Sequence, residues 1–339
     1  MLFSSINVRS TEKESSLTLL GAKKCHPDHA AACNAPMAMQ GPPSRRFDLK
    51  GDFLYWYSNQ SGMGYTTKPE STFTTSDFSE GTLIKPTFDW KPGVRIDAIY
   101  GIDQSYWSFG TDVILYRGTG SGSKSTQATN GLFPALSFAD NSLPTDYAND
   151  AKIHWTLHST LFDVLTSYEW ICSSYFTLTP SLGLRNAWLT EKAHAHYKGG
   201  TYQAGTDIVH LKSSFYGIGP RLALKPQFRL GQRFFFYAEG AGTAFAGWFD
   251  VHQSEKFLGT TRAALSRKIS RVQWSIDTTA GFVYMYNISK KMHLLFDLGF
   301  DYYIFFRQNA FVQGSQFNLH SQGTALTLYG GHAAIGFRF

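Results

Sequence analysis

The chain has 339 residues, of which 43% are hydrophobic and 17% charged, and its formal net charge is +6. No apolar run approaches the roughly 18 to 20 residues that a membrane-spanning helix needs, which excludes a helical membrane protein but leaves a membrane barrel open. The lysines and arginines form no basic tract, so we expect no nucleic-acid partner.

Residues 1–48 differ in character from the rest of the chain. Charges gather in "RSTEKESS" and small or turn-forming residues in "HAAACNAPMAMQGPPS", which indicates a disordered segment or a processed leader. The apolar run "LTLLGA" is shorter than the core of about 7 to 15 residues that a secretory signal needs, so no clear signal peptide is found. The Cys and His residues of "CHPDHAAAC" lack the paired spacing of structural zinc sites, and we expect no metal and no cofactor.

Within residues 49–339, apolar or aromatic residues alternate with polar ones, which is the pattern of strands with two different faces. In one such stretch, Trp274 and Ile276 alternate with Ser275 and Asp277. Ten stretches of this kind predict ten strands: 50–58, 92–102, 105–117, 152–170, 174–190, 213–225, 232–249, 270–288, 291–307 and 324–339. The longest exceed the five or six residues that are usual in globular sheets.

Long and short connections alternate between these strands. The long ones are 59–91, 118–151, 191–212, 250–269 and 308–323. Together with short turns such as "GID" and "SKK", they predict an all-β fold, a transmembrane antiparallel up-and-down β-barrel with long external loops and short periplasmic turns. The first two long loops can fold inward and narrow the opening. A hairpin formed by "GMGYTTK" and "GTLIKPTF" would raise the strand number from ten to twelve.

Aromatic residues cluster near the ends of the predicted strands. Amphipathic rings favour the headgroup level of a bilayer, so these residues predict two aromatic girdles. They are Tyr55, Tyr57, Trp107, Tyr168, Trp170, Trp188, Trp248, Tyr284 and Tyr286. The alternative is ordinary aromatic packing in the core of a β-sandwich.

Charged residues of both signs fall on the opposite, inward face of nearly every predicted strand. The predicted lumen-lining residues are Asp52, Arg95, Asp97, Asp112, Asp163, Glu169, Arg185, Arg221, Arg233, Glu239, Arg271, Asp277, Asp297, Asp301 and Arg338. Burying so many charges costs several kcal/mol each unless they are paired. The interior is therefore expected to be either a water channel or a salt-bridged plug, in a barrel too narrow for a wide pore.

Several stretches resemble a known family when they are taken in order. They are "GDFLYWYS" (51–58), "FDWKPGVRIDAIYG" (88–101), "YWSFGTDVILYR" (106–117), "LTPSLGLRNAWL" (178–189), "GIGPRLAL" (217–224), "FYAEGAGTAFAGWF" (236–249) and the terminal "AAIGFRF". The chain resembles the major outer membrane protein-like family of Legionella and of environmental chlamydiae. This resemblance implies an outer-membrane β-barrel porin in the cell outer membrane of a Gram-negative bacterium, with some members acting as surface antigens or adhesins. Because chlamydial relatives cross-link their envelope by disulfides, it also implies envelope proteins as partners, through Cys172.

The sequence thus predicts a porin-like channel for passive diffusion of small hydrophilic solutes or ions. The alternative is a non-conducting surface barrel that acts as an adhesin or antigen through its external loops, and a third reading is a secreted soluble β-protein. We expect no enzyme, because the inward residues Asp97, Asp112, Asp163 and Asp297 show no evident histidine partner at the same level. The expected partners are outer-membrane lipid, a second copy of the chain and the barrel assembly machinery, with Phe339 as the assembly signal.

Overall fold

The computed structural model describes residues 46–69, 81–127, 131–137, 146–289, 292–313, 320–321 and 323–339. The predictions for residues 1–45, including the leader and its Cys and His residues, lie outside these ranges. No helix in the described part of the chain is long and apolar enough to cross a membrane.

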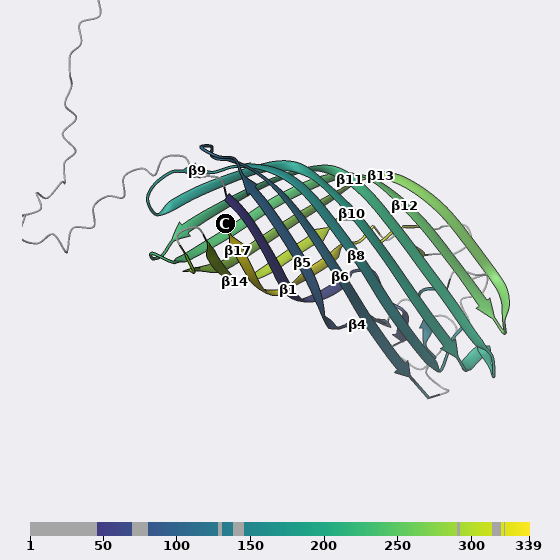
Figure 1. Cartoon of the computed structure of the whole chain (residues 1–339). Coiled ribbons are helices and arrows are strands. Elements are labelled where there is room, and N and C mark those ends of the chain that lie inside the picture. Colours follow the sequence, from purple (N-terminus) through teal and green to yellow (C-terminus); the bar gives the residue numbers. More distant parts are fainter. Residues whose placement is uncertain are drawn as a thin grey trace, which may run out of the picture. The chain divides into compact units, whose positions relative to one another are not determined.

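Ten long strands form one closed antiparallel barrel (Figure 1). In chain order they are β1 (Arg46–Gln60), β5 (Trp90–Gly101), β6 (Trp107–Ser125), β8 (Asp150–Tyr168), β10 (Phe176–Lys198), β11 (Thr206–Arg229), β12 (Phe234–Phe257), β13 (Thr260–Asn287), β14 (His293–Phe305) and β17 (Leu326–Arg338). Each strand pairs with its sequence neighbours among these ten, and β17 pairs with β1 from Asp48 opposite Arg338 to Gln60 opposite Leu326. The predicted fold class is confirmed.

Short elements fill the connections. The remaining strands are β2 (Thr66–Pro69), β3 (Gly81–Ile84), β4 (Thr87–Phe88), β7 (Phe133–Pro134), β9 (Trp170–Ile171), β15 (Val312–Gln313) and β16 (His320–Ser321), and a 3₁₀ turn, η2, spans Gly200–Tyr202. The hairpin considered as an eleventh and twelfth strand exists as β2 and β3, but it pairs with β7 and not with the wall. The barrel wall therefore has ten long strands, not twelve.

Two predicted external loops were wrong. The strands β10 to β13 continue through most of 191–212 and 250–269, so these regions are hairpins that extend the wall. The β12–β13 hairpin closes through Leu258 and Gly259, with φ angles of 51° and 81°, as a two-residue turn with positive φ at both positions requires.

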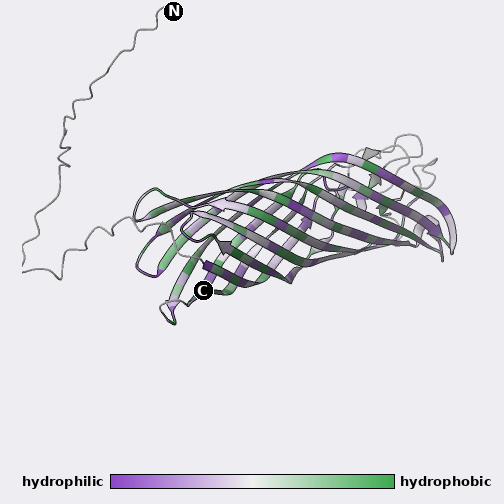
Figure 2. Ribbon diagram, turned by 45° about the horizontal axis from the view of Figure 1, so that its top comes forward, coloured by the Kyte–Doolittle hydropathy of each residue, from purple (hydrophilic) through white to green (hydrophobic). Residues whose placement is uncertain are grey.

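The sequence did not predict these hairpins because the hydropathy of the two strand faces is exchanged along the strand. The outward positions are apolar toward the short turns and polar toward the hairpin tip. Toward the short turns, β10 presents Leu182 and Leu184 outward and Arg185 inward. Toward the hairpin tip it presents Lys192 outward and buries Ala193 inside. Figure 2 shows hydrophobic and hydrophilic residues alternating along the strands. Below we call the end of the barrel with the short turns the turn end and the opposite end the loop end.

Exposed apolar side chains on the outside of the wall, such as Leu182, Leu222 and Trp274, form a surface that we call the apolar belt. Aromatic rows border it toward the loop end. Trp188, Tyr216 and Trp248 are neighbours across β10, β11 and β12, and the rings of Tyr216 and Trp248 stack at 5.6 Å. On the other side of the barrel, Tyr57 packs against Trp90 at 5.6 Å, in one row with Tyr329 and Tyr302. We call these seven residues the upper girdle.

Segments from the long connections occupy the interior at the loop end. We call 61–69, 131–137 and 308–311 the mouth segments. Their residues Met63, Tyr65, Leu136 and Phe311 are almost fully buried in one apolar cluster with the wall residues of the loop end. Tyr197 donates a hydrogen bond to the carbonyl of Tyr65 at 2.6 Å. Residues from 61–69 in the first long loop and from 131–137 in the second therefore lie inside the barrel, so these parts fold inward as predicted.

Candidate functional site: a buried ion-pair network inside the barrel

The inner network begins with two arginines near the middle of the barrel. Arg185 on β10 donates two hydrogen bonds to Asp163 on β8, at 2.7 and 2.6 Å, and a third to Asp277 on β13 at 2.7 Å. Arg221 on β11 bridges Asp277 at 2.7 Å and Glu239 at 3.0 Å. Two guanidinium groups thus link β8, β10, β11, β12 and β13 across the lumen.

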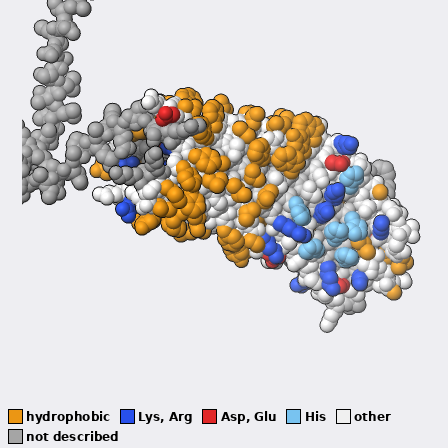
Figure 3. Space-filling view, viewed as in Figure 1, with side chains coloured by type: hydrophobic (Ala, Val, Ile, Leu, Met, Phe, Trp, Pro, Cys, Tyr) orange, Lys and Arg blue, Asp and Glu red, His pale blue; other side chains and the backbone are white. Residues whose placement is uncertain are grey.

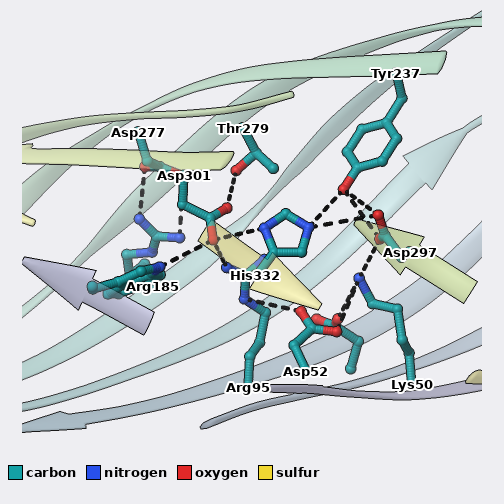
Figure 4. A network of polar contacts seen from close by, with 12 residues as sticks. Lys50, Asp52, Arg95, Arg185, Tyr237, Asp277, Thr279, Asp297, Asp301 and His332 are labelled. Carbon is teal, nitrogen blue, oxygen red and sulfur yellow. Dashed lines mark hydrogen bonds and ion pairs between the residues drawn. The ribbon is translucent and has the colours of Figure 1, made fainter. Parts of the chain in front are cut away.

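A second cluster is built around Asp301 on β14 (Figure 4). Its carboxylate accepts from Arg95 at 2.7 Å, from Thr279 at 2.8 Å and from the indole of Trp56 at 3.3 Å. Nδ1 of His332 lies 2.9 Å from the same carboxylate. Asp301 has no exposed surface, so these partners replace the water that a carboxylate needs.

Lys50 on β1 holds a third group of carboxylates together. Its ammonium lies 3.4 Å from Asp52, 3.1 Å from Asp97 and 3.1 Å from Asp297. Asp297 also accepts from the hydroxyl of Tyr237 at 3.0 Å. The network therefore continues through β1, β5, β12 and β14.

Asp297 corrects one prediction. Nε2 of His332 lies 3.5 Å from its carboxylate, so the expectation that this inner carboxylate has no histidine partner was wrong. His332 is only 2% exposed, because β17 directs it into the barrel between Asp297 and Asp301.

Three further predicted residues lie at the turn end. Arg338 forms a bidentate pair with Asp48, at 2.8 and 2.7 Å, and Glu169 pairs with Arg46 at 2.9 Å. Arg233 is exposed in the turn between β11 and β12. The structure thus places Glu169, Arg233 and Arg338 outside the central network.

Arg271 and Asp112 also stand apart. Arg271 lies 4.3 Å over the ring of Phe249 and donates to the carbonyl of Arg307, at the level of the upper girdle. Asp112 sits in register between Asp97 and Asp163, and one of its oxygens has no hydrogen-bond partner among the described residues.

The sequence-based set omitted Lys50, Trp56, Tyr237 and His332. Lys50 shares the strand phase of Asp52, and His332 shares that of Arg338, so the alternation alone could have found both. Trp56 and Tyr237 are aromatic residues on the inner face, and a search for inward charges does not select aromatic side chains. Their role depends on which carboxylate lies opposite, and only the strand register gives that.

The centre of the network is almost fully buried. Arg185 has no exposed surface, Asp163 is 2% exposed and Asp277 4%, and every one of them has an opposite charge within 2.7 Å. Of the two interiors expected from the sequence, this conformation is the salt-bridged plug. Such a network stays stable only while its partners remain together, because one unpaired buried charge is costly.

Beyond the upper girdle, the inner face carries a different kind of acidic residue. Burial raises the pKa of Glu191 to about 8. Burial, with Glu255 nearby, raises the pKa of Asp207 to about 7. Ser137 of the mouth segments donates to Glu255 at 2.8 Å. Glu191 and Asp207 are therefore at least partly protonated near neutral pH, and Glu255, close to Asp207, contacts a mouth segment through Ser137.

No group of three or more His, Cys, Asp and Glu side chains in the described part of the chain is arranged to hold a metal ion. Cys172 is a free, exposed thiol between β9 and β10.

The sequence profile of a family described as Legionella pneumophila major outer membrane protein precursor matches residues 42–339. No curated protein sequence matches the chain. Among solved structures, the outer membrane protease OmpT from Escherichia coli aligns at 12% identity and a TM-score of 0.40, over 88% of this chain and 97% of that one. OprG from Pseudomonas aeruginosa aligns at 11% and 0.26, over 89% and 98%. The Pseudomonas putida toluene transporter TodX aligns at 9% and 0.27, over 88% and 89%. These structural likenesses are too low to transfer a property to this chain.

Proposed function

The chain belongs to the family of the Legionella pneumophila major outer membrane protein, and we propose that this barrel is a channel through which small hydrophilic solutes or ions cross the outer membrane by passive diffusion. The mouth segments act as its gate, and the inner network lines its narrowest part. Diffusion requires that the mouth segments leave the loop end and that the ion pairs of the inner network separate enough to open a path. The loop end lies on the external side in this proposal.

The buried charges are the observation that carries this proposal. Ion pairs inside the barrel link β1, β5, β8, β10, β11, β12, β13, β14 and β17. Replacing a buried ion pair with well-packed apolar residues is often neutral or stabilising by about 1–4 kcal/mol. A barrel that only needed a solid core would gain nothing from this arrangement, whereas a polar path needs charges at its constriction.

The gate proposal rests on how the mouth segments are attached. They contact the wall through apolar packing and a few polar bonds, such as Tyr197 to Tyr65 and Ser137 to Glu255. Among the described residues the segments are joined to one another by the pairing of β2 with β7 and by a hydrogen bond from Asn309 to the carbonyl of Ser61. They are not part of the barrel wall. Their displacement therefore leaves the ten long strands paired.

Planar bilayer recording tests the channel. We expect stepwise conductance from the refolded protein, and flat current at high protein load, with the barrel shown to be folded, contradicts the proposal. The double variant Tyr65→Ala/Phe311→Ala removes two buried anchors of the mouth segments and should increase the open fraction several-fold. Leu83→Ala, at a residue that is 47% exposed on β3, is the matched control and should leave the recordings unchanged.

A second candidate is a non-conducting surface barrel that binds host or neighbouring surfaces. The apolar filling of the loop end and the long hairpins β10–β11 and β12–β13 favour it. Flat current combined with saturable binding to host cells, lost when the hairpin tips are replaced by short turns, would support this candidate. Under neither candidate function do we propose a catalytic activity, because His332 and Asp301 are almost fully buried.

A further inference from the structure

A basic surface lies on the outside of the barrel, next to the apolar belt (Figure 3). It occupies the outward positions of β6, β8, β10, β11, β12 and β13 between the upper girdle and the loop end. We call it the basic band, and it consists of Arg117, Lys152, His154, His158, Lys192, His194, His196, His210, Lys212, His252, Lys256 and Lys268. One carboxylate, Asp250, also points outward within these rows of the strands, and it lies 3.2 Å from His252. At the upper edge, Asp150 and Lys198 add one charge of each sign.

Strand register makes the basic band continuous. His154, His194 and His210 are direct neighbours across β8, β10 and β11, and Nδ1 of His194 lies 2.7 Å from Nδ1 of His210. In the next row toward the belt, Lys192 and Lys212 are opposite each other. Of the 11 histidines in the chain, six therefore lie on this one surface.

The band also lies at a defined height. Lys192 follows Trp188 of the upper girdle by four positions on β10, and Lys212 precedes Tyr216 by four on β11. At about 3.3 Å per residue along a tilted strand, this is roughly 10 Å above the girdle. The headgroup region of a phospholipid bilayer adds about 5–8 Å on each side of the hydrocarbon core. Lys192 and Lys212 therefore lie at the outer edge of this region and the histidine rows above it, at the height of a headgroup larger than that of a phospholipid.

We infer that the basic band binds the phosphate groups of a phosphorylated glycolipid in the outer leaflet. Lysine ammonium groups and histidine N–H groups are donors suited to phosphate oxygens, and charge-assisted bonds of this kind are the stronger ones. Like charges packed this closely repel one another, and an anion between them removes the repulsion. A metal ion does not explain the cluster, because no metal-binding group of three His, Cys, Asp or Glu side chains occurs among the described residues.

The histidines give this contact a pH dependence. Partial burial and neighbouring positive charges, Lys192 and Lys198 among them, lower the pKa of His194 and His196. Burial, together with the charges of Arg117 and Lys192, lowers the pKa of His158. Burial, together with the charge of Lys256, lowers the pKa of His210. A bound phosphate favours the protonated rings. Binding should therefore strengthen as the pH falls below about 6.5, the ordinary value for histidine.

Native mass spectrometry of the full chain in detergent tests the inference. The probes are bisphosphorylated lipid A, fully dephosphorylated lipid A and inorganic pyrophosphate. We expect the bisphosphorylated lipid to bind at least tenfold more tightly than the dephosphorylated one. Lys192→Gln/Lys212→Gln should weaken the binding roughly 5- to 30-fold. Lys68→Gln/Lys85→Gln removes the same charge from exposed positions outside the band and should have no effect.

Three results would overturn the inference. The first is equal affinity for the phosphorylated and dephosphorylated lipids. The second is an equal loss of lipid affinity in the two double lysine variants. The third is pyrophosphate binding as tight as lipid binding, which would indicate a site for free phosphate. The pH arm uses His154→Asn/His194→Asn/His210→Asn. Its affinity should vary several-fold less between pH 5 and pH 8 than that of the unchanged protein, and an identical pH profile would contradict the role of the histidines. Boiling-dependent gel mobility shows that each variant is folded.

Discussion

Arg185 compensates two carboxylates at once, and this single residue shows how the interior is stabilised. Arg185→Met leaves Asp163 and Asp277 sharing only Arg221. Removing one partner of a buried ion pair typically costs about 3–5 kcal/mol, so we expect a loss of that size in urea unfolding in lipid vesicles. Arg233→Met, at the exposed turn, should cost less than about 0.5 kcal/mol. Equal losses would mean that the network does not stabilise the barrel.

Glu191 gives the loop end its own pH response. Its pKa is about 8 in the folded protein, against an ordinary value of 4.5. Between these values the folded protein holds a proton that the unfolded chain has released, so stability falls as the pH rises from about 4.5 to 8. Glu191→Gln should flatten this part of the profile of unfolding temperature against pH. Asp89→Asn, at an exposed residue, should leave the slope in place, and a slope unaltered by Glu191→Gln would contradict the assignment.

At the residue scale, the sequence shows which side chains point inward but not which of them meet. The alternation that selected Arg95, Arg185 and Asp301 is local, and it needs only a few residues on either side. The pairing of Arg95 with Asp301 joins strands 206 positions apart. This pairing depends on the register in which the strands pair when the barrel closes, and a local sequence pattern does not contain that information.

At the scale of the strand, the sequence predicted those parts that cross the membrane and missed their extensions. Leu182, Leu184 and Trp188 face outward in the first half of β10 and mark it as a membrane strand. In the second half the outward positions are Lys192, His194 and His196, because this part faces water and headgroups. Polar and apolar residues still alternate there, but the polar ones are on the outward face. The composition of this half of the strand resembles that of a polar loop.

The role of Phe339 in barrel assembly, expected from the sequence, stays a prediction. Phe339 exchanges two backbone hydrogen bonds with Phe47, at 2.9 and 3.1 Å, and its ring stacks on Phe337 at 6.4 Å. Deleting Phe339 removes these two backbone hydrogen bonds between the chain ends but none of the inner ion pairs. We expect several-fold less folded barrel in cells, and near-normal conductance after refolding in vitro. Normal yield in cells would contradict the assembly role.

At the scale of the whole molecule, the family membership and the outer-membrane location predicted from the sequence are confirmed, and the ten-strand barrel is observed. Ion selectivity tests whether the inner network lines the conducting path. Arg221→Gln removes a positive charge from the centre of the network and should shift the reversal potential toward cations. Arg271→Gln, at the level of the upper girdle, should shift it less. Equal shifts, or none, would contradict the proposed path.

The seam between β1 and β17 has a kinetic consequence. It pairs Asp48 with Arg338, 290 positions away, and the contacts of Trp56 with Asp301 and of Lys50 with Asp297 also cross it, over 245 and 247 positions. Contacts between such distant residues have the largest loop-closure cost and slow folding. We therefore expect the ion pairs that cross the seam to form late in folding. They act as a latch, which converts an open curved sheet with exposed charges into a closed barrel in that late step.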